Sequence, residues 1–378
     1  MTRVAITGTG VVSPAGHSAA ALLQAFEAQR RVCVTAPEFR SDDAPVGKVD
    51  LAAIEPRLGR RSLRALDRTG RLVAIAVAQA LETSGLATAS PDDEIGLVVG
   101  TMFCSLHTIA EFDRRAITVG PEYVSPLDFP NTVLNAAAGQ AAIWHGLRGI
   151  NATVAAGEAS GLQAIAYAGD LVRWGRATTI VAGGADELCL ESFLAFEGSR
   201  SVRHATAARP DGFVPAEGAG FICLEATSSA RGRGARVCGF IEGSGCTLAR
   251  DRSSAALTEA LAAAIAAALR DADADGEEID AIGVAANGTC ARDEAEMSAL
   301  RHVFGSRLDR IRRAALKSVI GETLGAAGPL QVIAFVEQMA GASDSDEAPP
   351  RLALCNAISA AGNCCALIIG AADGEHAR

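Results

Sequence analysis

Short apolar runs alternate along the chain with longer segments in which apolar side chains recur every three or four residues. The runs are rich in Val, Ile, Leu and Ala and predict strands at 3–7, 95–99, 178–182, 220–224, 281–285, 351–355 and 365–369. The three-to-four-residue period predicts helices at 18–29, 68–85, 159–174, 254–271, 294–303 and 326–340. Strands that alternate with helices in this way predict an α/β fold whose sheets are buried between helical layers.

The predicted elements are joined by short polar segments, of which 271–278 (DADADGEE) and 343–350 (SDSDEAPP) are the clearest. No linker is long enough to separate independently folded units. A chain of 378 residues can build two domain-sized halves around a large core. We place these halves at 1–230 and 231–378 and expect them to pack closely against each other.

Composition excludes several classes of partner. The net charge is −10 and aromatic residues make up 4%, so neither a basic field nor stacking platforms for nucleic acid are expected. No apolar run reaches the length needed to span a membrane. None of the ten cysteines lies in a CxxC pair, so we expect no metal site. The cysteines are expected to be free thiols, and the N-terminus predicts a strand rather than a signal peptide. Both expectations favour a reducing, cytoplasmic location.

Three glycine-rich stretches could be mistaken for nucleotide-binding loops. Residues 8–16 (GTGVVSPAG) follow a predicted strand but lack the GxGxxG spacing, and 183–186 (GGAD) are expected to form a turn at a strand end. Residues 321–328 (GETLGAAG) lack the Lys-Ser/Thr ending of a P-loop, and their small side chains predict close packing against another backbone. We therefore expect no bound cofactor.

Five blocks, in order along the chain, resemble the β-ketoacyl-ACP synthase (ketosynthase) family. They include the segments VAAGEASGLQA, NGTCARDEAE and NAISAAGNCCALI, and lie at 128–187, 209–225, 287–296, 317–328 and 356–368. The resemblance covers essentially the whole chain. It implies the thiolase fold, in which two similar βαβαβαββ halves stack in five layers, αβαβα, and the protein dimerises.

The resemblance also identifies the positions at which the family carries its reacting groups. The nucleophilic cysteine of the family, at the start of a buried helix, is replaced here by Glu158. The two histidines that assist decarboxylation are replaced by Asn287 and Glu322. Lys317 and Glu296, which the family pairs as a supporting ion pair, are retained. The chain thus keeps the framework of the site and changes all three reacting positions.

These changes argue against Claisen condensation. Transfer of an acyl group from a thioester to Glu158 would give a mixed anhydride, which is uphill and rapidly hydrolysed. Asn287 cannot exchange a proton near pH 7, and an ionised Glu322 would repel an enolate. The resemblance therefore favours a chain-length factor, the non-catalytic partner of an active ketosynthase in a type II polyketide, polyene or fatty-acid-like system. We expect a heterodimer, and an acyl carrier protein that supplies phosphopantetheine.

Two other functions stay open. In the first, the chain is a stand-alone malonyl-ACP decarboxylase or hydrolase that uses Glu158 and Glu322, because two carboxylates in one site favour a raised pKa for one of them. In the second, it is a homodimeric scaffold that binds acyl-ACP without chemistry. Cys290 is a candidate displaced nucleophile. The plainer expectation is that backbone N–H groups satisfy Glu158 and that Lys317 or water satisfies Glu322.

Two surfaces are candidates for contacts with partners. Residues 57–71 (RLGRRSLRALDRTGR) are expected to present Arg60, Arg64, Arg68 and Arg71 along one helix face, which is either a solvated face or a docking site for an acidic carrier protein. The candidates for docking are Arg60, Arg61, Arg64 and Arg68. Residues 128–156 resemble the family segment that forms the dimer. Phe103 and Leu134 are our candidates for side chains that line the acyl tunnel and limit chain length.

Overall fold

The computed structural model describes residues 2–39, 43–59, 63–86, 94–204, 211–341 and 348–372. One mixed ten-stranded sheet runs through the described part of the chain in the order β10-β9-β11-β12-β8-β1-β7-β6-β4-β5. Its strands are β1 Val4–Val12, β4 Gly96–Gly100, β5 Asn151–Val154, β6 Thr179–Asp186, β7 Gly218–Ala226, β8 Gly239–Leu248, β9 Ala281–Gly283, β10 Arg312–Ala314, β11 Leu352–Ile358 and β12 Asn363–Ala371. Strands β2 Val34–Thr35 and β3 Pro45–Val46 form a separate small ribbon.

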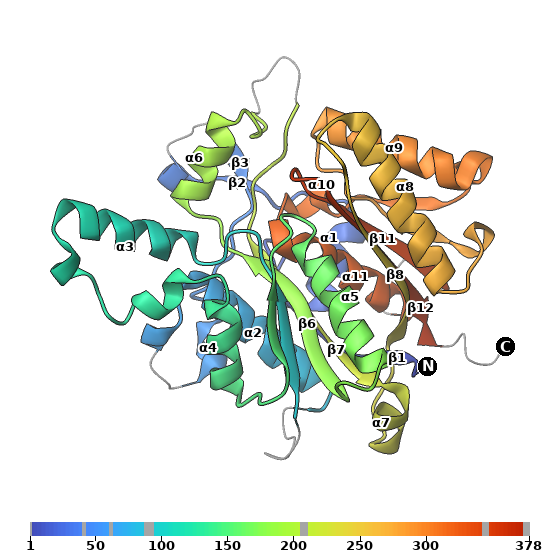
Figure 1. The fold of residues 1–378 in the computed structure, drawn as a ribbon, viewed down its shortest axis with the longest axis horizontal. Helices are drawn as coiled ribbons and strands as arrows, with labels where there is room; N and C mark the ends of the chain where they lie inside the picture. The colour runs from blue at the N-terminus through green and yellow to red at the C-terminus, as the bar shows by residue number, and fades with distance from the viewer. Residues whose placement is uncertain are drawn as a thin grey trace.

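Helices surround this sheet and also lie between its two halves (Figure 1). They are α1 Ala19–Glu27, α2 Arg68–Thr83, α3 Leu106–Thr118, α4 Ala136–His145, α5 Ser160–Arg173, α6 Leu190–Gly198, α7 Thr227–Gly232, α8 Ser254–Asp271, α9 Cys290–Phe304, α10 Lys317–Ile320 and α11 Ala327–Met339. Ser18, Asp67 and Ser253 cap α1, α2 and α8 through side-chain oxygens that accept from backbone N–H groups.

The sheet contains the same topology twice. In the first half, β1 pairs with β7 and β7 with β6 antiparallel, and β6, β4 and β5 are parallel. In the second, β8 pairs with β12 and β12 with β11 antiparallel, and β11, β9 and β10 are parallel. A short antiparallel contact between β1 and β8, at Val4 to Ile6, joins the halves. The two halves are therefore structural repeats.

The hydrophobic core follows five layers. Helices α5 and α11 are buried in a central cluster that takes side chains from both halves, such as Ile165 and Phe335. Helix α2 packs on the opposite face of the first half, and α8 and α9 pack on the opposite face of the second. Figure 1 shows α2, α5 and α8 on successive sides of the sheet halves. This α-β-α-β-α order agrees with the predicted thiolase fold.

Some predictions about individual segments are wrong. Residues 183–186 continue β6 and are not a turn, and β1 extends beyond its predicted end through residues 8–10. Close packing explains the glycines: a Cβ at Gly10 would lie 1.9 Å from the carbonyl oxygen of Ala76 in α2. The predicted packing of 321–328 is confirmed, because a Cβ at Gly161 of α5 would lie 2.0 Å from the carbonyl oxygen of Gly325.

The arginine-rich segment does not form one helix. Short 3-10 turns cover Glu55–Leu58 and Leu63–Ala65, and α2 begins only at Arg68, after its cap. Arg60 and Arg61 lie outside the described residues. Arg64 and Arg68 therefore lie in separate elements and do not share a helix face, whereas the prediction for Arg60 and Arg61 lies outside the described residues. Over the described ranges, no helix combines the length and apolar character needed to cross a bilayer.

Candidate functional site

Glu158 lies in the turn that connects β5 to α5, and its side chain is buried. Gly157 precedes it with φ of +63°, a left-handed conformation in which a Cβ would also meet the hydroxyl of Ser359 at 2.2 Å. The Ser160 hydroxyl accepts from Ala156 N at 2.8 Å and faces the carbonyl oxygen of Thr101 at 3.0 Å. The turn therefore fixes the position of the carboxylate before any partner is considered.

Glu158 is held by an arginine that the sequence did not reveal. Nη1 of Arg292 donates to one carboxylate oxygen at 2.6 Å, and the backbone N–H of Ala360 donates to the other at 3.1 Å. Burial alone would raise the pKa of Glu158, but the charge and hydrogen bonds of Arg292, with the backbone donors, lower it below its usual value. Glu158 is therefore a stable anion at neutral pH, and the raised pKa expected of a general acid is not found there.

The second carboxylate, Glu322, is also fully engaged in hydrogen bonds and an ion pair. Lys317 Nζ and Asn287 Nδ2 both lie 2.8 Å from its Oε2, and the backbone N–H of Leu324 donates to Oε1 at 3.0 Å. The expectation that Lys317 satisfies Glu322 is confirmed. The expected Lys317–Glu296 ion pair is wrong: with a carboxylate at position 322, the ammonium group pairs with it and also donates to the carbonyl of Ala285 at 3.0 Å.

Glu296 is fully buried and has different partners. Its Oε1 accepts from Ala285 N at 2.8 Å and from Asn356 Nδ2 at 3.2 Å. Burial raises the pKa of Glu296 to about 7, although these two hydrogen bonds oppose the rise. The side chain thus ties α9 to the ends of β9 and β11, and the nearby charge of Lys317 also opposes the rise in its pKa.

One connected hydrogen-bond network joins the two substituted carboxylates. Arg292 donates to the hydroxyl of Thr289 at 3.2 Å, and the backbone N–H of Thr289 donates to Asn287 Oδ1 at 3.1 Å. Asp293 accepts from Asn287 N at 3.1 Å and from Gly288 N at 3.0 Å, which fixes the same loop. The structure therefore brings Glu158, Asn287 and Glu322 together, as their sequence positions predicted.

The space beside this network is very small. Asn287, Arg292, Asp293 and Glu296 line a cavity of about 10 Å³ together with Ala285, Ala286 and Ile358. That volume holds about one water molecule. Arg292 thus borders this cavity and also donates to Glu158, which stands where the family resemblance places the nucleophile.

Cys290 does not have the environment of a nucleophile. It is the first residue of α9 and is exposed, and its backbone N–H donates to Asp211 at 2.9 Å. The hydrogen bond and negative charge of Asp211 raise the pKa of the Cys290 thiol. A reactive thiolate needs the opposite shift. The displaced-nucleophile hypothesis therefore has no support in the geometry.

Asp186, at the end of β6, is a buried positioning residue that our sequence reasoning missed. Its carboxylate accepts from Thr101 Oγ1 and from the backbone N–H groups of Met102, Phe103, Cys104 and Gly325, at 2.7 to 3.2 Å. Burial raises the pKa of Asp186. All of its hydrogen-bond partners are donors, however, so a proton on the carboxyl group would find no acceptor, and we therefore assign the ionised form. The signal that could have revealed Asp186 in the sequence is an acidic residue within an otherwise apolar strand.

The two candidate tunnel residues lie in different settings. Phe103 is half-buried, and its ring centroid lies 5.9 Å from that of Phe196, which in turn lies 5.0 Å from that of Phe213. Leu134 lies on the surface of the single chain with 48% of its area exposed. The segments that carry them are nevertheless neighbours, because Cys104 Sγ lies 4.0 Å from the carbonyl oxygen of Val133. The tunnel roles of Phe103 and Leu134 stay predictions.

The arginines are also not equivalent. Arg68 donates from Nη2 at 2.6 Å and from Nε at 2.8 Å to Glu217, a fully buried carboxylate. Burial would raise the pKa of Glu217, but Arg68 and Lys48 lower it. Arg68 thus pairs with a buried carboxylate while 31% of its side chain stays exposed, and its docking role stays a prediction. Arg64 is exposed, so its docking role stays a prediction.

Comparisons with known proteins agree with this architecture. Residues 1–230 match the family model described as "Beta-ketoacyl synthase, N-terminal domain", and residues 238–343 match "Beta-ketoacyl synthase, C-terminal domain". The 3-oxoacyl-[acyl-carrier-protein] synthase 2 of Vibrio cholerae is 30% identical over 89% of this chain and 87% of its own length. The tetracenomycin polyketide synthase ketoacyl synthase alpha subunit of Streptomyces glaucescens is 30% identical over 88% and 83%.

Solved structures resemble the whole chain. The ishigamide ketosynthase/chain length factor superposes with a TM-score of 0.83 at 25% identity, covering 98% of this chain and 99% of that one. A beta-ketoacyl synthase from Burkholderia phymatum gives a TM-score of 0.86 at 24% identity, covering 98% and 100%. With the repeated sheet topology and both family matches, these findings establish that the chain belongs to the beta-ketoacyl synthase family.

Proposed function

We propose that this chain is a non-catalytic ketosynthase homologue, of the chain-length-factor type, that pairs with an active ketosynthase. The Glu158–Arg292 ion pair carries the proposal. It fills the position at which the family resemblance places the nucleophile with a buried anion of lowered pKa, and it places a guanidinium group beside that anion. A carboxylate held in this way cannot replace a thiolate in acyl transfer.

Relatives of known function support the metabolic setting. One similar structure is that of a ketosynthase/chain length factor, and one similar sequence is the alpha subunit of a polyketide synthase ketoacyl synthase. By analogy we place this chain in type II polyketide, polyene or fatty-acid-like synthesis. Its substrate would arrive on the phosphopantetheine arm of an acyl carrier protein, and the active partner would supply the thiolate.

The surface of the chain supports a partner subunit. Strand β5 is the outermost strand of the sheet, so among the described residues one of its edges has no neighbouring strand and can pair with a strand of a partner. Segments near it in sequence expose large apolar side chains, among them Phe129 at 63% and Ile143 at 77%. An apolar surface of this kind beside a free strand edge is typical of a subunit interface.

The stand-alone decarboxylase or hydrolase is the weaker candidate. A general acid at Glu158 would need a raised pKa, whereas Arg292 lowers it. Glu322 would have to leave its contacts with both Lys317 and Asn287 to meet a substrate. A homodimeric scaffold uses the same interface as the heterodimer, so it is distinguished by partner choice rather than by the site.

Activity of the purified chain alone tests the proposal. The chain is incubated with malonyl-ACP and with acyl-ACP, and mass spectrometry follows the mass of the carrier-bound groups. We expect no condensation, decarboxylation or hydrolysis above the rate of the carrier alone. An active ketosynthase in parallel confirms that the carriers are competent. Turnover that persists in Cys290→Ser but disappears in Glu158→Gln would overturn the proposal in favour of the stand-alone enzyme.

A further inference from the structure

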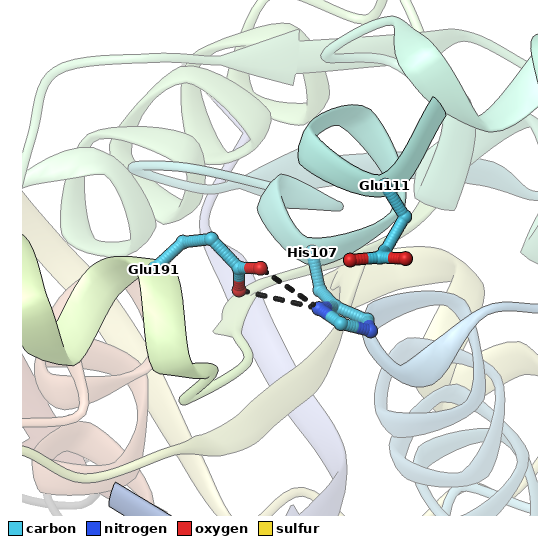
Figure 2. A group of neighbouring side chains, drawn as sticks. All are labelled: His107, Glu111 and Glu191. Carbon is cyan, nitrogen blue, oxygen red and sulfur yellow. Dashed lines mark hydrogen bonds and ion pairs between the residues drawn. The ribbon is translucent and has the colours of Figure 1, made fainter. Parts of the chain in front are cut away.

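A cluster of one histidine and two glutamates lies away from the Glu158 network, where α3 meets α6. His107 and Glu111 are four residues apart on α3, and Glu191 lies in the first turn of α6. One ligand atom from each residue lies within 4.8 Å of the other two. Figure 2 shows the imidazole of His107 between the two carboxylate groups. Residues 84 positions apart in the chain thus meet at one point.

The contacts around His107 fix its ring toward Glu191. Its Nδ1 lies 3.2 Å from both carboxylate oxygens of Glu191. The two i and i+4 positions on α3 face the same side of the helix, which is the spacing at which helices commonly present two metal ligands. The side chains are half-buried to exposed, so an ion could enter from solvent and keep water molecules as further ligands.

The backbone under this cluster is held independently of any ion. The N–H of His107 donates to the buried carboxylate of Glu187 at 3.0 Å, and Glu187 lies just before α6. The start of α6 is fixed in turn by Ser192, whose hydroxyl faces both the N–H and the carbonyl of Cys189. The two helices therefore present their ligands from a preformed scaffold, which reduces the ordering cost of binding.

We propose that His107, Glu111 and Glu191 bind a divalent transition-metal cation, with zinc as the best match. One imidazole nitrogen and two carboxylate oxygens form a mixed N/O set that suits zinc better than magnesium or calcium, which prefer oxygen ligands alone. Three protein ligands leave a coordination position for water. This site has no part in the proposed function and stands or falls separately from it.

Two features of the surroundings limit the affinity. Arg114 pairs with Glu111 in the same helix, so metal binding competes with that contact. His107 and Glu191 both lie in first turns of helices, where the helix dipoles oppose a cation. We therefore expect micromolar dissociation constants, in contrast to the tighter binding of a closed structural zinc site. Removing Arg114 with Arg114→Gln should strengthen binding.

A bound ion would connect α3 to α6. Helix α3 extends away from the rest of the molecule in Figure 1, and its far end exposes Ile117 at 84% and Val119 at 58%. Helix α6 carries Phe196, the ring that packs on Phe103. Metal binding at the base of α3 would therefore stabilise the arm against the segment that follows β4.

Isothermal titration with zinc chloride tests the site on the full chain after treatment with a chelator. We expect one site whose dissociation constant rises about tenfold or more in His107→Asn and in Glu191→Gln. A cobalt titration should give the visible absorption of a tetrahedral or five-coordinate ion in the wild type only. Magnesium at the same concentrations should give no comparable heat.

Two control variants exclude other ligands. His302→Asn removes an exposed histidine from α9, and Cys290→Ser removes an exposed thiol; neither should change the dissociation constant. Circular dichroism confirms that each variant is folded. The proposal is overturned if zinc binds equally well to wild type and to His107→Asn, if the site is lost in Cys290→Ser, or if no zinc binds at millimolar concentration.

Discussion

At the scale of single residues, Glu158, which stands where the family resemblance places a nucleophile, is one end of a buried ion pair. Glu158 is 5% exposed and the Arg292 side chain 15% exposed. Taking such groups from water costs several kcal/mol per ion, of the order of what their attraction returns. The pair therefore adds little net stability, but neither member can be lost alone without leaving an uncompensated charge.

A double-mutant cycle measures this dependence. We expect Glu158→Gln and Arg292→Gln each to lower the free energy of unfolding by about 2–4 kcal/mol, since each leaves one buried charge unpaired. The double variant should cost less than the sum by about 1.5–3 kcal/mol, measured by urea unfolding at pH 7. Additive effects would mean that the two side chains do not form the observed pair in solution.

The same variants have a defined pH dependence. Because the pKa of Glu158 is lower in the folded chain than its ordinary value of 4.5, the stability that this group contributes is complete above pH 4.5. It is lost as the pH falls through the lowered folded pKa. The stability difference between wild type and Glu158→Gln should therefore shrink in acid, and a constant difference between pH 7 and pH 3 would contradict the assignment.

At the scale of elements, Asp186 holds the segment between β4 and α3. One carboxylate accepts from five donors on the two segments that flank the end of β6. An amide in its place would turn an NH₂ group toward N–H donors. We expect Asp186→Asn to cost about 3 kcal/mol and to speed hydrogen exchange at Met102, Phe103 and Cys104.

A matched variant tests whether that effect is local. Asp170→Asn changes a partly exposed carboxylate on α5, which lies 3.6 Å from the Arg173 guanidinium, and should cost less than about 1 kcal/mol. Exchange at residues 102–104 should be unaffected by it. Equal stability losses in the two variants would show that Asp186 is not specifically required for this loop.

The elements also show which structural features the sequence could predict. Seven strands and six helices follow from their apolar pattern, because each buries a continuous face. Strand β8 was not predicted because it is glycine-rich. Cβ atoms at Gly243 and Gly245 would lie 2.4 and 2.1 Å from carbonyl oxygens of α8. Where backbones approach this closely, small residues replace the apolar run that marks a strand.

The site was predictable to the extent that its positions lie in motifs. Glu158, Asn287 and Glu322 were located from the blocks around them, and the structure brings them into one network. Arg292 was missed because only the fold places it 2.6 Å from a residue 134 positions away. The contact of Lys317 with Glu322 was expected, by contrast, because both residues lie in the block 317–328.

At the scale of the whole molecule, the edge strand of the first repeat is accompanied by an exposed apolar surface. Strands β5 and β10 occupy equivalent outer positions of the sheet. Near β5, exposed apolar side chains accumulate between Ile117 and Ile143, on α3, α4 and the turns that join them. Within the described residues, the first repeat thus combines a free strand edge with an extended apolar surface, which predicts association through this repeat.

Co-expression with an active ketosynthase homologue tests that interface. Ile143 is 77% exposed at the end of α4, so Ile143→Glu should leave the fold intact while placing a charge in the apolar contact. We expect native mass spectrometry to detect a heterodimer with the wild type and a loss of about tenfold or more in Ile143→Glu. Leu248→Glu, which alters a similarly exposed leucine on β8, is the control and should bind normally.

A heterodimer that survives both changes would place the interface elsewhere, because a charge buried without a partner at its centre could not be tolerated. A stable homodimer that ignores the ketosynthase would instead support the scaffold, since the same edge of β5 can pair with its own copy across a two-fold axis.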